Sequence, residues 1–408
     1  MNLLYNLAIR LYSLGAKIVS CRNDKARKML DGQNTAIEYL RSKLDPNEKY
    51  IWIHASSLGE FEQGRPLIEM LKKERPEKKI VLSFFSPSGY EVRHDFPLVD
   101  AVCYMPFDTK SNVNKFLDAL HPEMAFFIKY EFWGNYLQEL HRRGIPTYII
   151  SAIFRPSQAF FKPWGSMFRS MLRCFDHIFV QDKPSMALLA GIGLYNVTVA
   201  GDTRFDRVTD ILAGCKEIPE VAAMTSPGTT TIVAGSTWVP DEELILPYFN
   251  ANKSLRLVIA PHEVNEQRIQ QIESMLTRPS VRLSTTTIDE ARKSECIIID
   301  CFGKLASAYR YGNIAYVGGG FGVGIHNINE AAVYGIPVLF GPKHHKFKEA
   351  KDLVDLGGAY TFDNKASFIN IIEKLVNTSD LLTHSGSIAG TYINKNIGAT
   401  RLIFNKIF

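Results

Sequence analysis

The sequence predicts an α/β protein with two Rossmann-like, doubly wound halves. From residue 50 onward, short apolar segments alternate with helical segments, and this alternation is typical of a parallel sheet covered by helices. Near residue 320, two of the apolar segments enclose a glycine-rich loop, a common feature at a strand end in such folds. The chain has 408 residues, enough for about two domains that each bury a core.

The domain organisation follows from composition along the chain. We expect residues 1–20 to form an amphipathic helix, 21–213 the first Rossmann-like domain and 230–408 the second. Residues 214–229, which are rich in glycine and proline, are predicted to be the linker. The last helix could pack back on the first domain.

The totals exclude several classes of protein. Hydrophobic residues make up 46% and charged residues 22%, as in soluble globular proteins. The net charge of +5 is too small to indicate nucleic acid, and we expect no such partner. Six scattered cysteines without a CxxC pair indicate neither a zinc ribbon nor a disulfide framework, so a reducing, cytoplasmic compartment is favoured.

Two segments are candidates for contact with a membrane. In residues 1–20 one helical face is apolar, while Arg10 in the middle disfavours a spanning helix. The apolar face consists of Leu4, Leu7, Leu11, Leu14 and Ile18. Residues 154–173 combine aromatic with basic side chains and also suit the interface. The alternatives are a terminal helix packed on its own domain and a surface helix with snorkelling arginines.

The first half contains the strand–helix alternation with polar groups at strand ends. Its predicted strands are Tyr50–His54, Lys79–Phe84, Ala101–Tyr104, Met124–Ile128, Thr147–Ile150, His177–Val180 and Val197–Ala200. Glu60 follows the first strand on a glycine turn, where a general base could reach a substrate hydroxyl. Glu131 follows a second strand end, and Arg204 could stabilise phosphate or carboxylate charge. A structural ion pair or a helix-dipole partner is the alternative for each.

The second half repeats this pattern around the glycine loop. Its predicted strands are Thr231–Ala234, Leu255–Ala260, Cys296–Ile299, Ile314–Val317 and Ile336–Phe340. The loop after Val317 leads into a helix that starts near Asn327, which favours a nucleotide phosphate at the helix N-terminus. Ser236, His262, Gly303, Lys304 and Glu330 lie at strand ends or helix starts and could converge on one nucleotide. A glycine turn without a ligand is the alternative.

Taken together, these segments resemble the motifs of bacterial 3-deoxy-D-manno-octulosonic acid (Kdo) transferases, the glycosyltransferases of lipopolysaccharide synthesis. The matching segments are His54–Glu60, Glu131–Asn135, Gly235–Thr237, Asn327–Glu330 and Gly335–Pro342. They occur in the family's order over nearly the whole chain.

The resemblance implies a GT-B glycosyltransferase, with two Rossmann-like domains facing a central cleft. It implies no metal and no cofactor, and peripheral or N-terminal attachment to the cytoplasmic side of the inner membrane. The first domain would bind the acceptor, a lipid A precursor (lipid IVA), and the second would bind the donor, CMP-Kdo. Glu60 would be the general base for an inverting transfer that releases CMP, and Glu131 and Arg204 would assist the transition state.

The same resemblance assigns the donor-binding positions. They are Pro261, His262, Phe302, Gly303, Lys304, Asn327, Ile328, Asn329 and Glu330. The chain departs from the family at two of them, because family members usually have Arg at His262 and an acidic residue at Lys304. The usual Thr-Glu-Leu-Trp-Pro-Asn is also altered at Tyr130, Phe132 and Gly134.

Two other functions are compatible with the same two-domain organisation. One is a GT-B enzyme that uses a UDP-sugar, either a glycosyltransferase or a 2-epimerase. The other is a non-catalytic nucleotide-binding scaffold at the membrane. Fold alone does not separate them.

Overall fold

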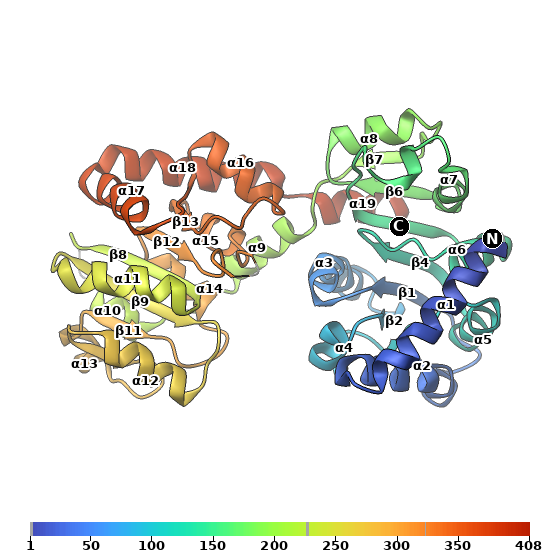
Figure 1. The fold of residues 1–408 in the computed structure, drawn as a ribbon, viewed down its shortest axis with the longest axis horizontal. Coiled ribbons are helices and arrows are strands. Elements are labelled where there is room, and N and C mark those ends of the chain that lie inside the picture. Colours follow the sequence, from blue (N-terminus) through green and yellow to red (C-terminus); the bar gives the residue numbers. More distant parts are fainter. Residues whose placement is uncertain (1–2, 226–227, 323) are drawn as a thin grey trace. The chain divides into compact units, whose positions relative to one another are not determined.

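The computed structural model describes residues 3–225, 228–322 and 324–408 and divides into two compact units (Figure 1). The N-terminal unit comprises Met1–Asp206 with Ile397–Phe408, and the C-terminal unit comprises Arg207–Asn396. Each unit is a seven-stranded parallel sheet with helices packed on it, so the predicted α/β fold with two Rossmann-like halves is confirmed.

The N-terminal sheet has the strand order β3-β2-β1-β4-β5-β6-β7. Its strands are β1 (Tyr50–Ala55), β2 (Lys79–Phe84), β3 (Ala101–Tyr104), β4 (Pro122–Ile128), β5 (Thr147–Ala152), β6 (His177–Val180) and β7 (Val197–Val199). The order reverses between β1 and β4, which are neighbours in the sheet. This is the topological switch point, outside whose carboxyl ends open α/β sheets bind ligands.

Helices cover both faces of this sheet. They are α1 (Leu3–Ser20), α2 (Asp24–Lys43), α3 (Leu58–Glu74), α4 (Pro87–Arg93), α5 (Lys110–Leu120), α6 (Gly134–Arg142), α7 (Ser166–Leu172), α8 (Lys183–Ala190) and α19 (Ala399–Ile407), with a 3-10 turn η1 (Ala159–Phe161). All six residues of β1 are buried, as expected for a strand covered on both faces. Even polar His54 is inside.

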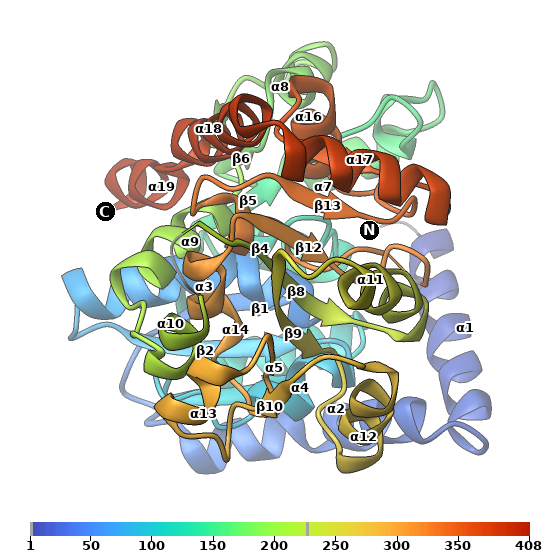
Figure 2. The same ribbon diagram turned by 90° about the vertical axis from the view of Figure 1, so that its left-hand side faces the viewer.

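The C-terminal sheet has the order β10-β11-β9-β8-β12-β13-β14, with its switch point between β8 and β12. Its strands are β8 (Thr230–Thr237), β9 (Leu255–Pro261), β10 (Ser280–Arg282), β11 (Cys296–Ile298), β12 (Ile314–Val317), β13 (Val338–Phe340) and β14 (Ala359–Thr361). The helices of this unit are α10 (Pro219–Met224), α11 (Val239–Ala251), α12 (Glu266–Met275), α13 (Ile288–Lys293), α14 (Leu305–Ala308), α15 (Asn329–Ala332), α16 (Lys348–Leu356), α17 (Lys365–Asn377) and α18 (Ser379–Asn396), with a 3-10 turn η2 (Tyr309–Tyr311). Figure 2 shows α17, α11 and α12 on one side of this sheet and α18, α10 and α13 on the other.

The predicted linker at 214–229 is wrong. The chain passes between the units at Asp206–Arg207, within α9 (Arg204–Ala213), and again at Asn396–Ile397. In the predicted linker, α10 packs on α13 and β11 of the C-terminal unit, and its Val221 and Met224 are buried. Glycine and proline in this segment mark turns around a short buried helix, and Pro219 occupies the first turn of α10, where proline is tolerated.

The last helix belongs to the N-terminal unit although its sequence follows the C-terminal one. In α19, Ile403 and Phe404 join the hydrophobic core formed by β1, β2 and α3. The carboxylate of Asp206 accepts hydrogen bonds from the backbone N–H groups of Gly398 and Thr400 at the start of α19. These bonds satisfy two of the donors that a helix N-terminus leaves unpaired.

The N-terminal helix spans Leu3–Ser20 of the predicted residues 1–20, of which residues 1–2 lie outside the described residues, and it has an exposed apolar face. Leu4, Leu7, Leu11, Leu14 and Ile18 are between 51% and 72% exposed, so this face does not pack on the rest of the unit. Among the described residues, no helix has both the length and the apolar character needed to cross a bilayer.

The aromatic and basic segment 154–173 is more internal than predicted. Phe154, Phe160 and Met171 are buried in the core of the N-terminal unit, and the Arg169 guanidinium donates to the carbonyl oxygen of Phe160. Only Trp164, at 67% exposed, among these large apolar side chains has the exposure that contact with a membrane requires.

Candidate active site

Glu60 lies at the switch point of the N-terminal sheet. It sits in the first turn of α3, directly after β1, and its side chain is half-buried. The Ser57 hydroxyl donates a hydrogen bond to the Glu60 carboxylate. Among the described residues no ion pair with the Glu60 carboxylate is found.

Tyr130 lies within electrostatic reach of both Glu60 and Arg204. Burial raises the pKa of the Tyr130 hydroxyl, the positive charges of Arg155 and Arg204 oppose this shift, and the negative charges of Glu60 and Asp202 add to it. All four charged groups therefore lie within electrostatic reach of one phenol. The structure brings Glu60 and Arg204, which are far apart in sequence, to one edge of the sheet.

Arg204 is held by a buried carboxylate. Its Nε and terminal nitrogen donate to Oδ2 of Asp202 at 3.1 and 2.8 Å, and Gln63 Nε2 donates to the same oxygen at 3.0 Å. Burial favours a neutral Asp202, but the Arg204 charge and these hydrogen bonds keep its pKa below the ordinary value. The Arg204 side chain is 24% exposed. Sequence reasoning missed Asp202, whose signal was its position in a polar turn after β7.

Glu131 lies in a buried network beside β1. Its Oε2 accepts from the Trp133 indole at 2.6 Å and pairs with His54 Nε2 at 3.2 Å. The other ring nitrogen of His54 bonds to the Ser83 hydroxyl, which also accepts from the Trp52 indole. Only 11% of the Glu131 side chain is exposed, so this carboxylate fixes the segment after β4 more than it offers a free oxygen to a substrate.

Three residues at the carboxyl-end edges of the two sheets have strained backbone conformations. Lys129, Ser151 and Ser236 have φ values of 65, 51 and 52°, in the left-handed region that disfavours side chains. Each lies at or next to the carboxyl end of a strand, namely β4, β5 and β8. Such conformations cost of order 1–3 kcal/mol each and cluster at functional sites.

A stack of three rings occupies the switch point of the C-terminal sheet. The His262 ring lies between the rings of Trp238 and His326, at centroid distances of 4.6 and 4.4 Å and interplanar angles of 28 and 29°. The Trp238 indole donates to His326 Nε2 at 3.3 Å. Burial and, as a smaller cause, the nearby His262 together lower the pKa of His326 to about 4, so the ring is a neutral acceptor at physiological pH. Trp238 and His326 were not predicted as site residues.

The glycine loop packs against its own chain more closely than the sequence suggests. A Cβ on Gly318 would lie 2.3 Å from the Ser236 carbonyl oxygen, and one on Gly320 would lie 2.6 Å from the backbone of Gly341. The buried Asp241 carboxylate accepts from Gly319 N at 3.0 Å and from Trp238 N at 2.9 Å. These glycines therefore let β8, β12 and β13 approach one another at the sheet edge.

The helix after the glycine loop is shorter than predicted. It begins at Asn329 and ends at Ala332, so it provides only one turn and a small dipole. Asn327 Nδ2 donates to Glu330 Oε1 at 3.0 Å, and its Oδ1 accepts from the Asn329 backbone. Burial raises the pKa of Glu330, while the Asn327 bond and the Arg207 charge oppose the shift.

The side-chain amide of Asn329 is buried and makes no hydrogen bond among the described residues. The residue is fully buried, Ile328 beside it is buried too, and both the Nδ2 and Oδ1 atoms of Asn329 lack a hydrogen-bond partner among the described residues. An unsatisfied buried polar group costs about 1–3 kcal/mol. Such groups often mark a position that a ligand or water completes.

The remaining predicted residues lie at the same sheet edge. Pro261 ends β9, beside the ring stack. Phe302, Gly303 and Lys304 follow β11 and are all exposed, Phe302 by 83%. Gly303 has φ 77°, which favours glycine at this position. The structure thus brings His262 next to His326 and leaves Phe302–Lys304 exposed to solvent.

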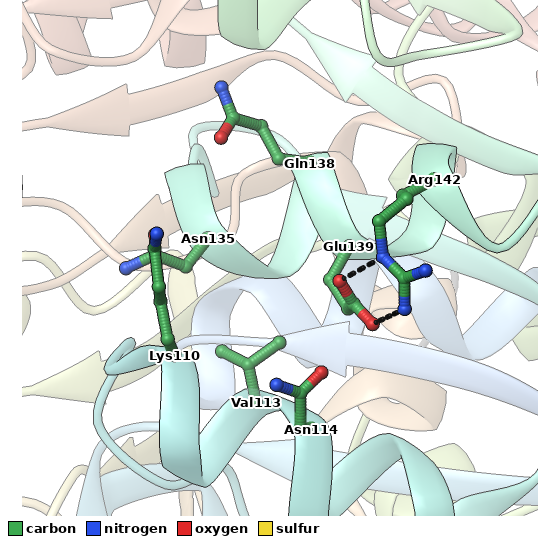
Figure 3. A pocket seen from close by; sticks show the side chains of 7 residues that line it. All are labelled: Lys110, Val113, Asn114, Asn135, Gln138, Glu139 and Arg142. Carbon is green, nitrogen blue, oxygen red and sulfur yellow. Dashed lines mark hydrogen bonds and ion pairs between the residues drawn. The ribbon is translucent and has the colours of Figure 1, made fainter. Parts of the chain in front are cut away.

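A separate cavity lies between α5 and α6 of the N-terminal unit (Figure 3). It has a volume of about 290 Å³ and contains none of the predicted site residues. Its lining residues are Lys110, Val113, Asn114, Asn135, Gln138, Glu139 and Arg142. In Figure 3, Glu139 and Arg142 form an ion pair on its wall. Within the described chain no cluster of three or more His, Cys, Asp or Glu side chains is arranged to hold a metal ion.

The family profile and the curated proteins that this chain resembles carry the same description. The profile of the family described as 3-deoxy-D-manno-octulosonic-acid transferase (kdotransferase) matches residues 33–207, most of the N-terminal unit. A 3-deoxy-D-manno-octulosonic acid transferase of Aquifex aeolicus is 26% identical over 358 residues, 85% of this chain and 92% of the relative. The enzyme of the same name from Haemophilus influenzae is 25% identical over 88% of this chain and 87% of its own.

Solved structures share the fold at low sequence identity. UDP-GlcNAc 2-epimerase from Neisseria meningitidis, bound to UDP-GlcNAc, superposes with a TM-score of 0.60 at 15% identity, over 88% of this chain and 99% of that one. MurG from Acinetobacter baumannii superposes with a TM-score of 0.57 at 12% identity, over 88% and 99% of the two chains. These likenesses place the chain in the GT-B fold class.

Proposed function

Because this chain is related over most of its length to the 3-deoxy-D-manno-octulosonic acid transferases, we propose that it is a glycosyltransferase that transfers Kdo from CMP-Kdo to a lipid A precursor. The observation that carries the proposal is the extent of this similarity, which covers both units of the chain. The gathering of Glu60, Tyr130 and Arg204 at one switch point supports it, since sugar transfer needs a base and a cation near the reacting hydroxyl.

We assign the donor to the C-terminal unit. The ring stack of Trp238, His262 and His326 offers flat apolar surface to a nucleotide base. The orphaned amide of Asn329 and the carboxyl of Glu330 offer hydrogen bonds to ribose or base. At the two departures from the family, His262 takes part in the stack and exposed Lys304 can approach phosphate.

The chemical step is a single displacement with inversion. The Glu60 carboxylate takes the proton of the acceptor hydroxyl, and the oxygen attacks the anomeric carbon of Kdo. The bond from that carbon to the phosphate oxygen breaks, and CMP leaves with the electron pair. Arg204 and Glu131 act at the same edge, Arg204 by its charge and Glu131 by holding the segment after β4. No metal and no cofactor enters this proposal.

We further propose peripheral attachment to the cytoplasmic side of the inner membrane. The exposed leucine face of α1 supports it, together with the basic residues that follow, which favour anionic lipid. Segment 154–173 contributes at most through Trp164, because its other large apolar groups are mainly internal.

The decisive variant is Glu60→Gln. Glutamine keeps an oxygen for the Ser57 hydroxyl but cannot take a proton, so we expect transfer to fall by about 10²-fold or more. The measurement is product analysis by mass spectrometry after incubation with CMP-Kdo and lipid IVA, in EDTA. Near-normal turnover by this variant would refute the base assignment.

Nucleotide binding provides the control. CMP should raise the melting temperature of wild type and Glu60→Gln equally, because binding stabilises the folded state. Protection by UDP and not by CMP would instead favour an enzyme that uses UDP-sugars. Binding of CMP without any transfer by the wild type would favour a non-catalytic scaffold.

A further inference from the structure

The first helix is tied to the segment that carries Glu131. While its leucines are exposed, Tyr5 and Asn6 are half-buried, and in Figure 1 the first turns of α1 lie beside α6. The Tyr5 hydroxyl donates to Asp108 and accepts from Gly134 N at 2.9 Å. Asn6 Oδ1 accepts from Asn135 Nδ2 at 2.9 Å. The link therefore reaches two consecutive residues of the segment Glu131–Asn135.

Asp108 is the buried acceptor of this hydrogen-bond network. It is fully buried, and its Oδ2 and Oδ1 accept from the backbone N–H groups of Asn135 and Tyr136 at 3.0 and 2.9 Å. The Asp108 carbonyl oxygen also accepts from Asn135 Nδ2. Loss of the Tyr5 hydroxyl would leave Gly134 N–H without its acceptor and Asp108 with one donor fewer. Unpaired buried groups of this kind are costly, so the segment would shift or loosen.

A second connection from α1 runs through aromatic rings. Tyr12 lies against Phe85 at a centroid distance of 6.4 Å, and Phe85 packs on Trp133 at 4.7 Å. The Trp133 indole then donates to the Glu131 carboxylate. The aromatic contacts of α1 thus end at the Glu131 carboxylate through Trp133, and its polar contacts end on Gly134 and Asn135 of the same segment.

We propose that Tyr5 and Asn6 are positioning residues for Kdo transfer: from α1 they hold the segment Glu131–Asn135, and through it Glu131, in the geometry that the reaction needs. The inference rests on the proposed function. It implies that the helix with the exposed leucine face also sets the active-site geometry, so contact with lipid and catalysis depend on two different faces of the same helix. A misplacement of about 1 Å that originates far from the reacting groups can cost about 10²-fold in rate.

The test compares Tyr5→Phe and Asn6→Ala with Tyr195→Phe, whose hydroxyl belongs to a residue that is 79% exposed outside the network. For Tyr5→Phe we expect kcat to fall about tenfold or more, with KM for CMP-Kdo within about twofold, because the donor is assigned to the other unit. Asn6→Ala should show a smaller loss of the same kind, and Tyr195→Phe should match wild type. An unchanged kcat in a folded Tyr5→Phe protein overturns the proposal.

Hydrogen exchange supplies a readout that is independent of activity. The amides of Gly134, Asn135 and Tyr136 should exchange faster in Tyr5→Phe than in wild type, and at the wild-type rate in Tyr195→Phe. Unchanged exchange at these amides also overturns the proposal. A wild type that transfers no Kdo would refute the proposed function, and the exchange experiment would still decide whether α1 positions this segment. If Tyr5→Phe does not fold, Asn6→Ala decides both readouts.

Discussion

Asp108 is a buried carboxylate that accepts hydrogen bonds from α1 and from the start of α6. Burial raises its pKa from 3.8 to about 6, although the Tyr5 hydroxyl and the N–H groups of Asn135 and Tyr136 favour the ionised form. In the folded chain this carboxyl therefore keeps its proton to a higher pH than in the unfolded chain. The free energy of unfolding then decreases as the pH rises between these two values.

This predicts a pH-dependent difference between wild type and Asp108→Asn. The stability that the raised pKa contributes is fully present below about pH 4 and is lost as the pH rises through 6, with a total of at most about 3 kcal/mol for a shift of about two units. The measurement is urea unfolding of both proteins at pH 4.5 and 7.5. The advantage of wild type over the variant should be larger at pH 4.5, and a constant difference would contradict the assigned shift.

Glu131 shows what sequence reasoning could and could not foresee about a residue. Its predicted position after a strand end is confirmed, because it follows β4, and its role in a site remains a prediction. Its partners were not foreseeable, because His54, two residues from the start of the turn after β1, meets it only through the pairing of β1 with β4. The same holds for Asp202 and Arg204, whose link to Gln63 joins the turn after β7 to α3.

At the scale of elements, the structure confirms the predicted location of the glycine loop. It gives a different physical reason for the glycines. The strand, loop and second strand occur where predicted, but the helix between them has one turn. Gly335, with φ 69°, lies three residues after that turn, and its backbone packs closely against Gly386 of α18. The glycines at 318 and 320 relieve contacts within the chain, a requirement that no spacing rule reveals.

Gly320→Ala should therefore be destabilising, while Gly322→Ala should be tolerated. The new methyl at 320 would overlap the Gly341 backbone, whereas at 322 the nearest atom is 3.6 Å away, an ordinary contact. We expect a loss of about 1–3 kcal/mol for the first variant, by overpacking, and a change near zero for the second. Urea unfolding and the CMP-induced shift in melting temperature measure both. Equal stability of the two variants would show that the loop can move away from β13.

At the scale of the whole molecule, the chain crosses between its units twice. Residues 207–396 form an inserted unit, and the last residues, Ile397–Phe408, complete the core of the first. Asp206 is the last residue before the chain enters the C-terminal unit. Its carboxylate accepts hydrogen bonds from the backbone of Gly398 and Thr400, just after the chain returns, so the hydrogen bonds join the two connecting segments. This ties the C-terminal residues to the stability of the N-terminal unit.

Ile403→Ala and Leu402→Ala form a matched pair that tests this. Ile403 is fully buried among residues of the N-terminal unit, whereas Leu402, its neighbour in α19, is 39% exposed. We expect Ile403→Ala to lower the free energy of unfolding by about 2–5 kcal/mol and Leu402→Ala to have a much smaller effect. The measurement is urea unfolding followed by hydrogen exchange, which should assign the loss to the N-terminal unit. A loss confined to residues 207–396 would contradict this packing.

The sequence by itself determined the two parallel α/β sheets, the strand ends that carry Glu60, Glu131 and Arg204, and the amphipathic nature of the first helix. These are local properties, set by residue periodicity and by the turn residues that follow each strand. Only the tertiary structure decided that 214–229 is not a linker, that Glu131 is enclosed by His54 and Trp133, and that Trp238 and His326 join His262 in a stack. Those facts depend on which strands become neighbours, and parallel pairing joins residues that are distant along the chain.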